Sequence, residues 1–203
     1  LIIMLGGDNY RIGMGGAAVS SANTGEFKSA IELNAVQRSN PEMQKRVANT
    51  IRSLAESHQN SIISIHDHGA GGHLNCLSEL VEETGGEIYI NKLPVGDSTL
   101  SDKEIIGNES QERMGLIISE KSFKKLDLIA SRERAPIYIV GKIKDDKKFV
   151  FKNTLNGNKP IDLKLKHLFG DVPKTKIFDS KRESNYKEIN YDFSKIENYL
   201  KMI

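Results

Sequence analysis

The sequence predicts a layered domain of the α/β or α+β class with mixed strand pairing. Short apolar runs of strand length alternate along the chain with longer stretches whose apolar residues recur at helical spacing. Hydrophobic residues make up 38% and charged residues 28% of the 203 residues, which is an ordinary balance for a globular protein with its own core. We find no internal repeat.

The N-terminal part is predicted to start with a buried strand over residues 1–5, followed by a loop over residues 8–25 that is rich in Gly, Ala, Ser and Asn. A helix is expected from residue 40 to about residue 57. Asn40 can cap this helix, Pro41 suits its first turn, and apolar side chains then recur at helical spacing. A short strand is predicted over residues 61–65.

The same criteria predict the remaining elements. Leucines at helical spacing indicate a helix over residues 74–81, which the Gly85-Gly86 pair ends. We further expect strands over residues 87–90, 114–118, 137–140 and 149–151, a helix over residues 122–132, and a turn at Asn156-Gly157.

The C-terminal segment differs in composition from the rest of the chain. Residues 174–203 hold seven Lys/Arg, five Asp/Glu and several aromatic side chains without a clear period. We therefore divide the chain into a domain over residues 1–173 and a linker or docking arm over residues 174–203. A partly ordered tail is the alternative.

Charge and cysteine content exclude several classes of protein. The net charge of +2 is too close to zero to predict a nucleic-acid or membrane partner. No apolar run is long enough to span a bilayer, and the apolar pentad at residues 1–5 is too short for a signal-peptide core. Cys76 is the only cysteine, so we expect no internal disulfide and a reducing, cytoplasmic location. Because the pentad opens the chain without an initiator Met, we expect a piece of a longer polypeptide, unless a flexible lead-in was lost or not recorded.

A dense polar cluster, Asn-Glu-Ser-Gln-Glu-Arg at residues 108–113, runs directly into the predicted strand over residues 114–118. Polar groups at the mouth of a buried strand are typical of ligand sites. Two glycine-rich segments, residues 13–16 and 69–72, can place backbone N–H groups against a phosphate. The first matches neither the P-loop nor the dinucleotide-binding pattern, so a tight turn remains its alternative. Together the three segments predict a site for a phosphorylated ligand with a metal ion.

Asp67 is the predicted metal ligand. It follows a predicted strand and precedes a glycine loop that enters a helix, where a carboxylate can bind Mg²⁺ while helix amides bind phosphate oxygens. The alternative is a helix-capping aspartate. His66, His68 and His73 fit no usual zinc spacing, so a supporting or packing role is predicted for them. Cys76 lies in the apolar stripe of a helix, which indicates packing rather than catalysis.

Five motifs occur in one order at compatible spacings and together resemble the phosphoribosylformylglycinamidine synthase family in its large, single-chain form. The resemblance covers roughly residues 1–176. The motifs are GMGGAAVSS at residues 13–21, VQRSNPEM at 36–43, HDHGAGG at 66–72, NESQER at 108–113 and RERAP at 132–136.

The resemblance implies a fragment, the C-terminal subdomain of the first synthetase half. Its fold would be that of the aminoimidazole ribonucleotide synthetase C-terminal domain: α+β, with three α/β/α layers and a mixed sheet. The family's enzyme converts formylglycinamide ribonucleotide, ATP and glutamine-derived ammonia to formylglycinamidine ribonucleotide in purine biosynthesis. The chain would thus be part of an ATP-dependent ligase, inactive alone. Most ATP contacts would come from an absent subdomain, and the partners would be the remaining domains, including the glutaminase.

The resemblance also implies roles for individual residues, although it assigns no catalytic residue. Asp67 matches a magnesium ligand, and Gln37, which spacing alone leaves undecided, matches a glutamine near formylglycinamide ribonucleotide. His68 departs from the pattern, since a smaller residue is expected there, and it could narrow the loop. The substrate-phosphate segment is Ser110, Gln111, Glu112 and Arg113, and the phosphate-binding loops contain Gly13, Gly15, Gly16, Gly69 and Gly71.

The sequence leaves two other functions open. The first is another ATP-using relative of the same fold, of the selenophosphate synthetase or thiamin-phosphate kinase type, which the segment at residues 110–113 disfavours. The second is a non-catalytic packing module, because one half of a duplicated enzyme can become structural. Asp67 with its glycine loop disfavours the second alternative.

Overall fold

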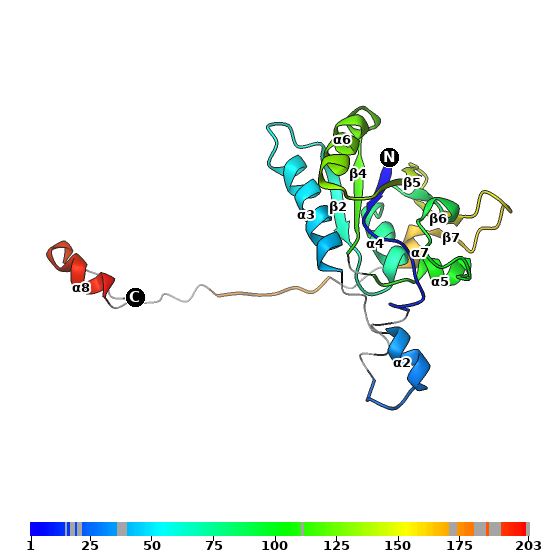
Figure 1. The fold of residues 1–203 in the computed structure, drawn as a ribbon, viewed down its shortest axis with the longest axis horizontal. Coiled ribbons are helices and arrows are strands. Elements are labelled where there is room, and N and C mark those ends of the chain that lie inside the picture. Colours follow the sequence, from blue (N-terminus) through cyan, green and yellow to red (C-terminus); the bar gives the residue numbers. More distant parts are fainter. Residues whose placement is uncertain are drawn as a thin grey trace. The chain divides into compact units, whose positions relative to one another are not determined.

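A computed structural model describes residues 1–14, 16, 19, 22–35, 40–110, 112–170, 174–180, 186 and 192–201 of the chain. It contains two compact units, Leu1–Asp171 and Val172–Ile203. The first unit holds a β-sheet and the helices that cover it (Figure 1). The described part of the second unit holds a 3₁₀ turn, Phe193–Lys195, and a short helix α8, Ile196–Leu200.

The sheet has seven strands in the order β2-β4-β1-β5-β3-β6-β7. Neighbouring strands are antiparallel except for β3 and β6, which are parallel. The predicted mixed pairing is therefore confirmed. The strands are β1 (Ile2–Leu5), β2 (Ile62–Asp67), β3 (Gly86–Tyr89), β4 (Met114–Ile118), β5 (Ile137–Ile143), β6 (Lys148–Lys152) and β7 (Ile161–Lys164).

Helices cover both faces of the sheet. The predicted start of α3 is confirmed, because the Asn40 side chain accepts a hydrogen bond from Met43 N at 3.0 Å. No helix among the described residues is long and apolar enough to cross a membrane. The helices are α2 (Ser29–Ala35), α3 (Pro41–Ala55), α4 (Gly72–Leu80), α5 (Asp102–Ile106), α6 (Phe123–Glu133) and α7 (Leu165–Phe169), with 3₁₀ turns at Ile90–Lys92 and Glu120–Ser122.

One face of the sheet packs against α3 and α6, which lie side by side (Figure 1). Side chains alternate along a strand, so Ile3 and Leu5 of β1 point to this face. Each fully buried aliphatic side chain contributes about 1.5–3 kcal/mol to folding. The cluster consists of Ile3, Leu5, Val47, Leu54, Leu116, Ile118, Leu126 and Ala130.

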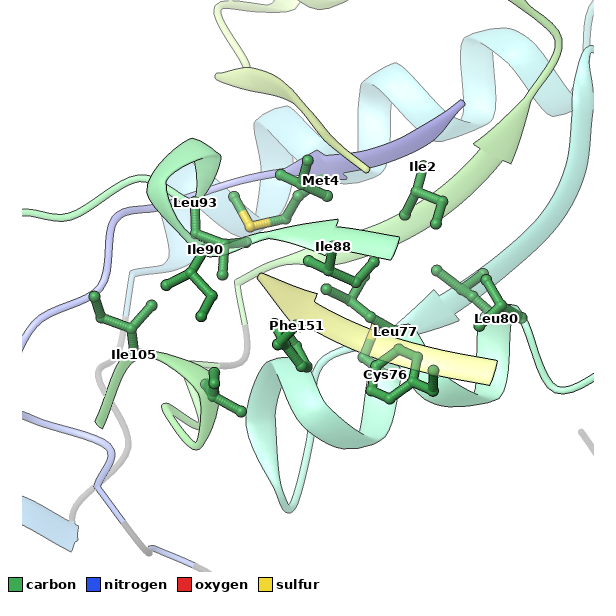
Figure 2. Packing of buried hydrophobic residues seen from close by; sticks show 14 of the residues in the cluster. Ile2, Met4, Cys76, Leu77, Leu80, Ile88, Ile90, Leu93, Ile105 and Phe151 are labelled. Carbon is green, nitrogen blue, oxygen red and sulfur yellow. The ribbon is translucent and has the colours of Figure 1, made fainter. Parts of the chain in front are cut away.

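The other face packs against α4, α5 and α7. Ile2 and Met4 of β1 point to this face and belong to one buried cluster with side chains of α4 and with Phe151 of β6 (Figure 2). Cys76 of α4 is fully buried in this cluster, and burial raises the pKa of its thiol to about 12. The predicted packing role of Cys76 is thus confirmed. Because helices lie on both faces, the predicted α/β/α layering is confirmed as well.

The structure also contains elements that the sequence reasoning omits: α2, α5, β7 and α7. For α5 the signal is present as a capping box, in which Ser101 Oγ accepts from Glu104 N and the Glu104 carboxylate accepts from Ser101 N. The loop prediction for residues 8–25 is wrong at Gly16 and Val19, which are helical. Gly16 is buried, and tertiary burial can override low helix propensity.

Candidate functional site

The strand ends that carry the predicted site residues lie at one edge of the sheet. β1 and β2 are both antiparallel to β4, so their carboxyl ends lie beside the start of β4, and Leu5 and Asp67 both pair with Met114. Leu5 also pairs with Ile137, the first residue of β5. The segments that follow β1 and β2 therefore converge with those that precede β4 and β5.

Asp67 is the last residue of β2, and its side chain is 72% exposed. The imidazole Nε2 of the neighbouring His66 contacts the carboxylate of Glu79 on α4. Among the described residues, no group of three or more His, Cys, Asp and Glu side chains is placed to hold a metal ion. Asp67 offers one exposed carboxylate at this edge, and Mg²⁺ is commonly bound by one or two carboxylates together with waters and substrate phosphates.

The glycine loops after β1 and β2 are tied to the rest of the domain by their own backbone groups. Gly13 N donates to Asn34 O at 2.7 Å, and Gly71 N donates to Glu109 Oε1 at 3.0 Å. A phosphate would have to displace these acceptors in order to bind the same two N–H groups. The loops are thus fixed in place, and Gly13 and Gly71 act first as structural positions.

We expect Gly72→Ala to lower the free energy of unfolding by about 2–3 kcal/mol. Gly72 has a φ of +59°, and an added Cβ would lie 2.6 Å from the carbonyl carbon of Asn108. Gly157 is the matched control, because its φ is +76° and nothing lies within 4 Å of its Cβ position. Gly157→Ala should therefore lower the free energy of unfolding by about 1 kcal/mol, which is the strain of a side chain in the left-handed backbone region. Urea denaturation measures both losses, and equal losses would contradict the close approach of the two loops.

The segment at residues 108–110 is buried and joins the two glycine loops. Asn108 Nδ2 donates to Tyr10 O at 2.6 Å, and Asn108 Oδ1 accepts from Ser110 Oγ at 2.9 Å. Glu109 N donates to Gly13 O at 2.9 Å, while the Glu109 carboxylate accepts from the loop after β2. The polar cluster that the sequence places at a strand mouth therefore connects three parts of the chain.

Arg113 is fully buried, and its guanidinium faces protein acceptors. Nε donates to Ser110 O at 3.1 Å, and Nη2 donates to Asn108 O at 2.5 Å and to Asn108 Oδ1 at 3.0 Å. Nη1 donates to Asn9 Oδ1 at 2.5 Å and lies 2.9 Å from His73 Nε2. These acceptors are enough for all five N–H groups, so direct phosphate binding by Arg113 finds no support in this geometry.

His68 and His73 are buried side by side, with ring centroids 4.7 Å apart and planes nearly perpendicular. His68 Nε2 lies 2.8 Å from His73 Nδ1. Burial lowers the pKa of both histidines well below the ordinary value, and the positive charge of Arg113 lowers it further. Both rings are therefore neutral near pH 7.

Because both rings are held neutral, stability should depend on pH between about pH 5.5 and 7. The pKa of His68 and His73 is depressed in the folded chain, whereas it lies near 6.5 in the unfolded chain. As the pH falls through about 6.5, the unfolded chain binds more protons than the folded chain, so the free energy of unfolding decreases. With both rings neutral, the loss between pH 7 and 5.5 is about 2–3 kcal/mol.

Urea denaturation at several pH values measures this loss. A double variant, His68→Gln with His73→Gln, serves as the control because it lacks both buried titratable rings. Its stability should change little between pH 5.5 and 7. The same slope in the double variant and in the original chain would contradict the assignment.

A polar pocket of about 260 Å³ opens at the same edge of the sheet. Asp8 and Tyr138 line it, with Tyr138 Oη donating to Asp8 Oδ1 at 3.4 Å, and Asn40 at the start of α3 contributes as well. Sequence reasoning missed Asp8, Asn9 and Tyr138. Asp8 and Asn9 carry the same signal that identified Asp67, namely polar residues directly after a buried strand.

The structure brings some of the predicted site residues together and leaves others undescribed. Asp67, Ser110, Glu112 and Arg113 lie at the shared edge, and of these only Asp67 is exposed. Gly16 is buried and Gly69 is half-buried. The predictions for Gly15, Gln37 and Gln111 concern positions outside the described residues.

Known proteins resemble the chain in sequence and in fold. A probable phosphoribosylformylglycinamidine synthase of Arabidopsis thaliana is 38% identical over 186 residues, which cover 86% of this chain and 13% of that protein. PurL of T. maritima, complexed with FGAR, matches 95% of this chain and 31% of its own with a TM-score of 0.74 and 21% identity. The same protein complexed with ATP matches 100% of this chain and 31% of its own with a TM-score of 0.66 and 18% identity.

The chain therefore spans only a small part of the relatives that it matches. A family model, described as AIR synthase related protein, C-terminal domain, matches residues 1–152. This match covers most of the unit that contains the seven-stranded sheet, including the converging loops. The chain belongs to the family of AIR synthase related C-terminal domains.

Proposed function

We propose that this chain is the C-terminal subdomain of the first synthetase half of a phosphoribosylformylglycinamidine synthase. The observation that carries the proposal is 38% identity over 186 residues to a relative of that name. The parent enzyme would convert formylglycinamide ribonucleotide, ATP and glutamine-derived ammonia to formylglycinamidine ribonucleotide. The solved structures of similar fold with FGAR and with ATP support this choice of ligands.

The chemistry places specific demands on the site. ATP phosphorylates the amide oxygen of the substrate, which turns that oxygen into a leaving group, and ammonia then displaces the phosphate. The protein contributes positioning and neutralisation of charge, which dominate catalysis of phosphoryl transfer. This chain would hold the ribonucleotide and one side of the phosphates, while an adjoining subdomain would hold most of the ATP.

Asp67 is the group in this chain that would hold Mg²⁺. Its exposed carboxylate at the end of β2 is open toward a ligand, unlike the buried side chains around it. When bound, the ion would neutralise phosphate charge. Gln37 and Gln111 remain proposed contacts for the ribonucleotide, and Arg113 is proposed to support the substrate-phosphate segment rather than to bind phosphate with its own side chain.

The C-terminal unit is proposed to be a linker or docking arm toward the next subdomain. Its described side chains include the exposed aromatic residues Phe178, Tyr186 and Phe193. Exposed aromatic side chains suit contacts with another domain. The partners would be the other domains of the parent chain, including its glutaminase.

One observation favours the second function, a packing module without ligand. The N–H groups of Gly13 and Gly71 and the guanidinium of Arg113 are all bonded to protein acceptors. In a domain that only supports its neighbours, the N–H donors can all be hydrogen-bonded within the chain, and none has to stay available for a ligand. The exposed carboxylate of Asp67 beside these loops favours the synthetase.

The isolated chain is expected to fold but to form no formylglycinamidine ribonucleotide. It has a complete core on both faces of its sheet, whereas its cysteine is buried and its thiol pKa is raised to about 12, which is unsuited to glutamine hydrolysis. Circular dichroism with a product assay tests both halves of the statement. Turnover by the purified chain, free of host enzyme, would overturn the proposal that it is one part of a larger active site.

A further inference from the structure

Asn9, His68, His73 and Arg113 form a continuous buried network at the edge of the sheet. Each of the four side chains is at most 1% exposed. They come from the segment after β1, the loop after β2, the first turn of α4 and the position before β4. Contacts between side-chain atoms of 2.5–3.1 Å join them, so four segments that are far apart in the chain meet at one point.

The chemistry of arginine sets the direction of these hydrogen bonds. A guanidinium can only donate, so the 2.9 Å contact between Arg113 Nη1 and His73 Nε2 is a hydrogen bond when Nε2 is bare. The 3.1 Å contact of His73 Nε2 with Asn9 Oδ1 then joins two acceptors of Arg113, whereas a hydrogen on Nε2 would donate to Asn9 and leave two donors facing each other at 2.9 Å. We assign the first arrangement. A neutral ring with a bare Nε2 carries its hydrogen on Nδ1, and His73 Nδ1 therefore donates to His68 Nε2. His68 in turn carries its hydrogen on Nδ1. Asn9 Oδ1 also accepts from Nη1, and its orientation is fixed because Asn9 Nδ2 donates to Pro94 O at 2.7 Å.

The network holds the backbone on both sides of the candidate site. Arg113 binds the carbonyl oxygens of Asn108 and Ser110, and its own carbonyl accepts from His68 N at 3.2 Å. His68 directly follows Asp67, so its backbone bond fixes the residue next to the exposed carboxylate. A shift of about 1 Å at such a position can cost about a hundredfold in rate, because reacting groups need accurate alignment.

The network is built at a cost that packing alone does not explain. His68 Nδ1 is buried and makes no hydrogen bond of good geometry among the described residues, and the Arg113 backbone is the polar group that interacts with this ring. A buried N–H group without a well-aligned acceptor is unfavourable. Two apolar side chains would fill this space without that cost, but they would leave Arg113 without one of its acceptors.

We propose that His68 and His73 are positioning residues, each with one fixed tautomer, that hold Arg113 and, through it, the loops around Asp67. Their effect on catalysis rests on the proposed function, whereas the tautomers are a property of the chain itself. The two parts of the proposal can therefore fail separately.

The first test reads the tautomers directly by long-range ¹H–¹⁵N NMR of the ¹⁵N-labelled chain at neutral pH. We expect a protonated Nδ1 and a bare Nε2 in both rings, with the His68→Gln and His73→Gln variants identifying the signals. A protonated Nε2 in His73, or rapid exchange between tautomers in either ring, would overturn the proposal whatever the parent enzyme does.

The second test compares His73→Leu with His73→Gln in the parent enzyme. The Gln side chain can present an acceptor oxygen near the position of Nε2, whereas Leu cannot. A positioning role predicts that Leu lowers synthetase kcat by about 10- to 100-fold, that Gln recovers most of this loss, and that glutamine hydrolysis is retained. His167→Leu on the exposed side of α7 is the control for replacing a histidine as such.

The outcomes separate the possible failures. Equal kcat in the Leu and Gln variants, with a lower melting temperature in both, would show packing alone and overturn the positioning role. If the Leu variant does not fold, the positioning role is still tested by the kcat of the Gln variant and by the tautomers that NMR reports. A parent enzyme that forms no formylglycinamidine ribonucleotide would refute the proposed function and leave the NMR result standing.

Discussion

Replacing Asp67 by Asn in the full-length parent is expected to lower synthetase turnover by about 100-fold or more. Groups that only orient a metal ligand typically contribute about 10- to 100-fold, so loss of a ligand itself should lie at or beyond the upper end of that range. The structure motivates the change, because Asp67 ends β2 with its carboxylate 72% exposed beside buried loops. Glutamine hydrolysis should remain largely intact. Steady-state assays of both half-reactions at varied Mg²⁺ measure the effect.

Asp127→Asn is the matched control, since Asp127 is exposed on α6 and is not among the residues that form the site edge. It should leave both half-reactions unchanged. Asp67→Asn should also raise the Mg²⁺ concentration needed for half-maximal activity. Normal synthetase activity with an unchanged Mg²⁺ dependence in this variant would refute the metal role of Asp67.

Arg113→Lys is expected to lower the free energy of unfolding by about 2–6 kcal/mol. A lysine side chain has three N–H donors on one nitrogen. The Arg113 guanidinium instead donates to five buried acceptor atoms, which belong to Asn9, His73, Asn108 and Ser110. At least two acceptors are then left unsatisfied, at about 1–3 kcal/mol each. Chemical denaturation of the chain measures the loss.

Arg52→Lys is the control for this change, because Arg52 is exposed on α3 and pairs only with Glu56 among the described residues. Its effect should stay within about 0.5 kcal/mol. In the parent enzyme, Arg113→Lys should weaken formylglycinamide ribonucleotide and ATP alike, because the whole site edge shifts. Selective loss of ribonucleotide binding at unchanged stability would instead restore the direct phosphate contact that the sequence suggested.

The parts of the fold that the sequence predicted are those with strong local signals. β1 and β4 are apolar runs, and α3 combines a capping residue, a proline in the first turn and a regular apolar stripe. α2 and α7 are short and largely exposed, so no long apolar pattern marks them. The two helical layers follow from the strand geometry, because successive side chains of β1 point to opposite faces of the sheet and all of them are apolar. The strand order depends on contacts between segments that are distant in sequence, and no local pattern specifies it.

The candidate site was predictable in its location and less so in its individual roles. Polar residues after a buried strand predicted Asp67, and the same rule applied to β1 would have found Asp8 and Asn9. Arg113 was assigned to the ligand because a guanidinium beside a strand suits phosphate. Its burial against Asn9 and His73 depends on segments 104 and 40 residues away in the chain, which no local pattern reveals.

Calorimetric titration of ligands into a complex of this chain with its adjoining synthetase subdomain tests the central claim most directly. We expect binding of formylglycinamide ribonucleotide and Mg²⁺-dependent binding of ATP, with the Mg²⁺ dependence weakened by Asp67→Asn. If the folded complex bound neither ligand at any Mg²⁺ concentration, the chain would be a packing module and the synthetase assignment of its site would be contradicted.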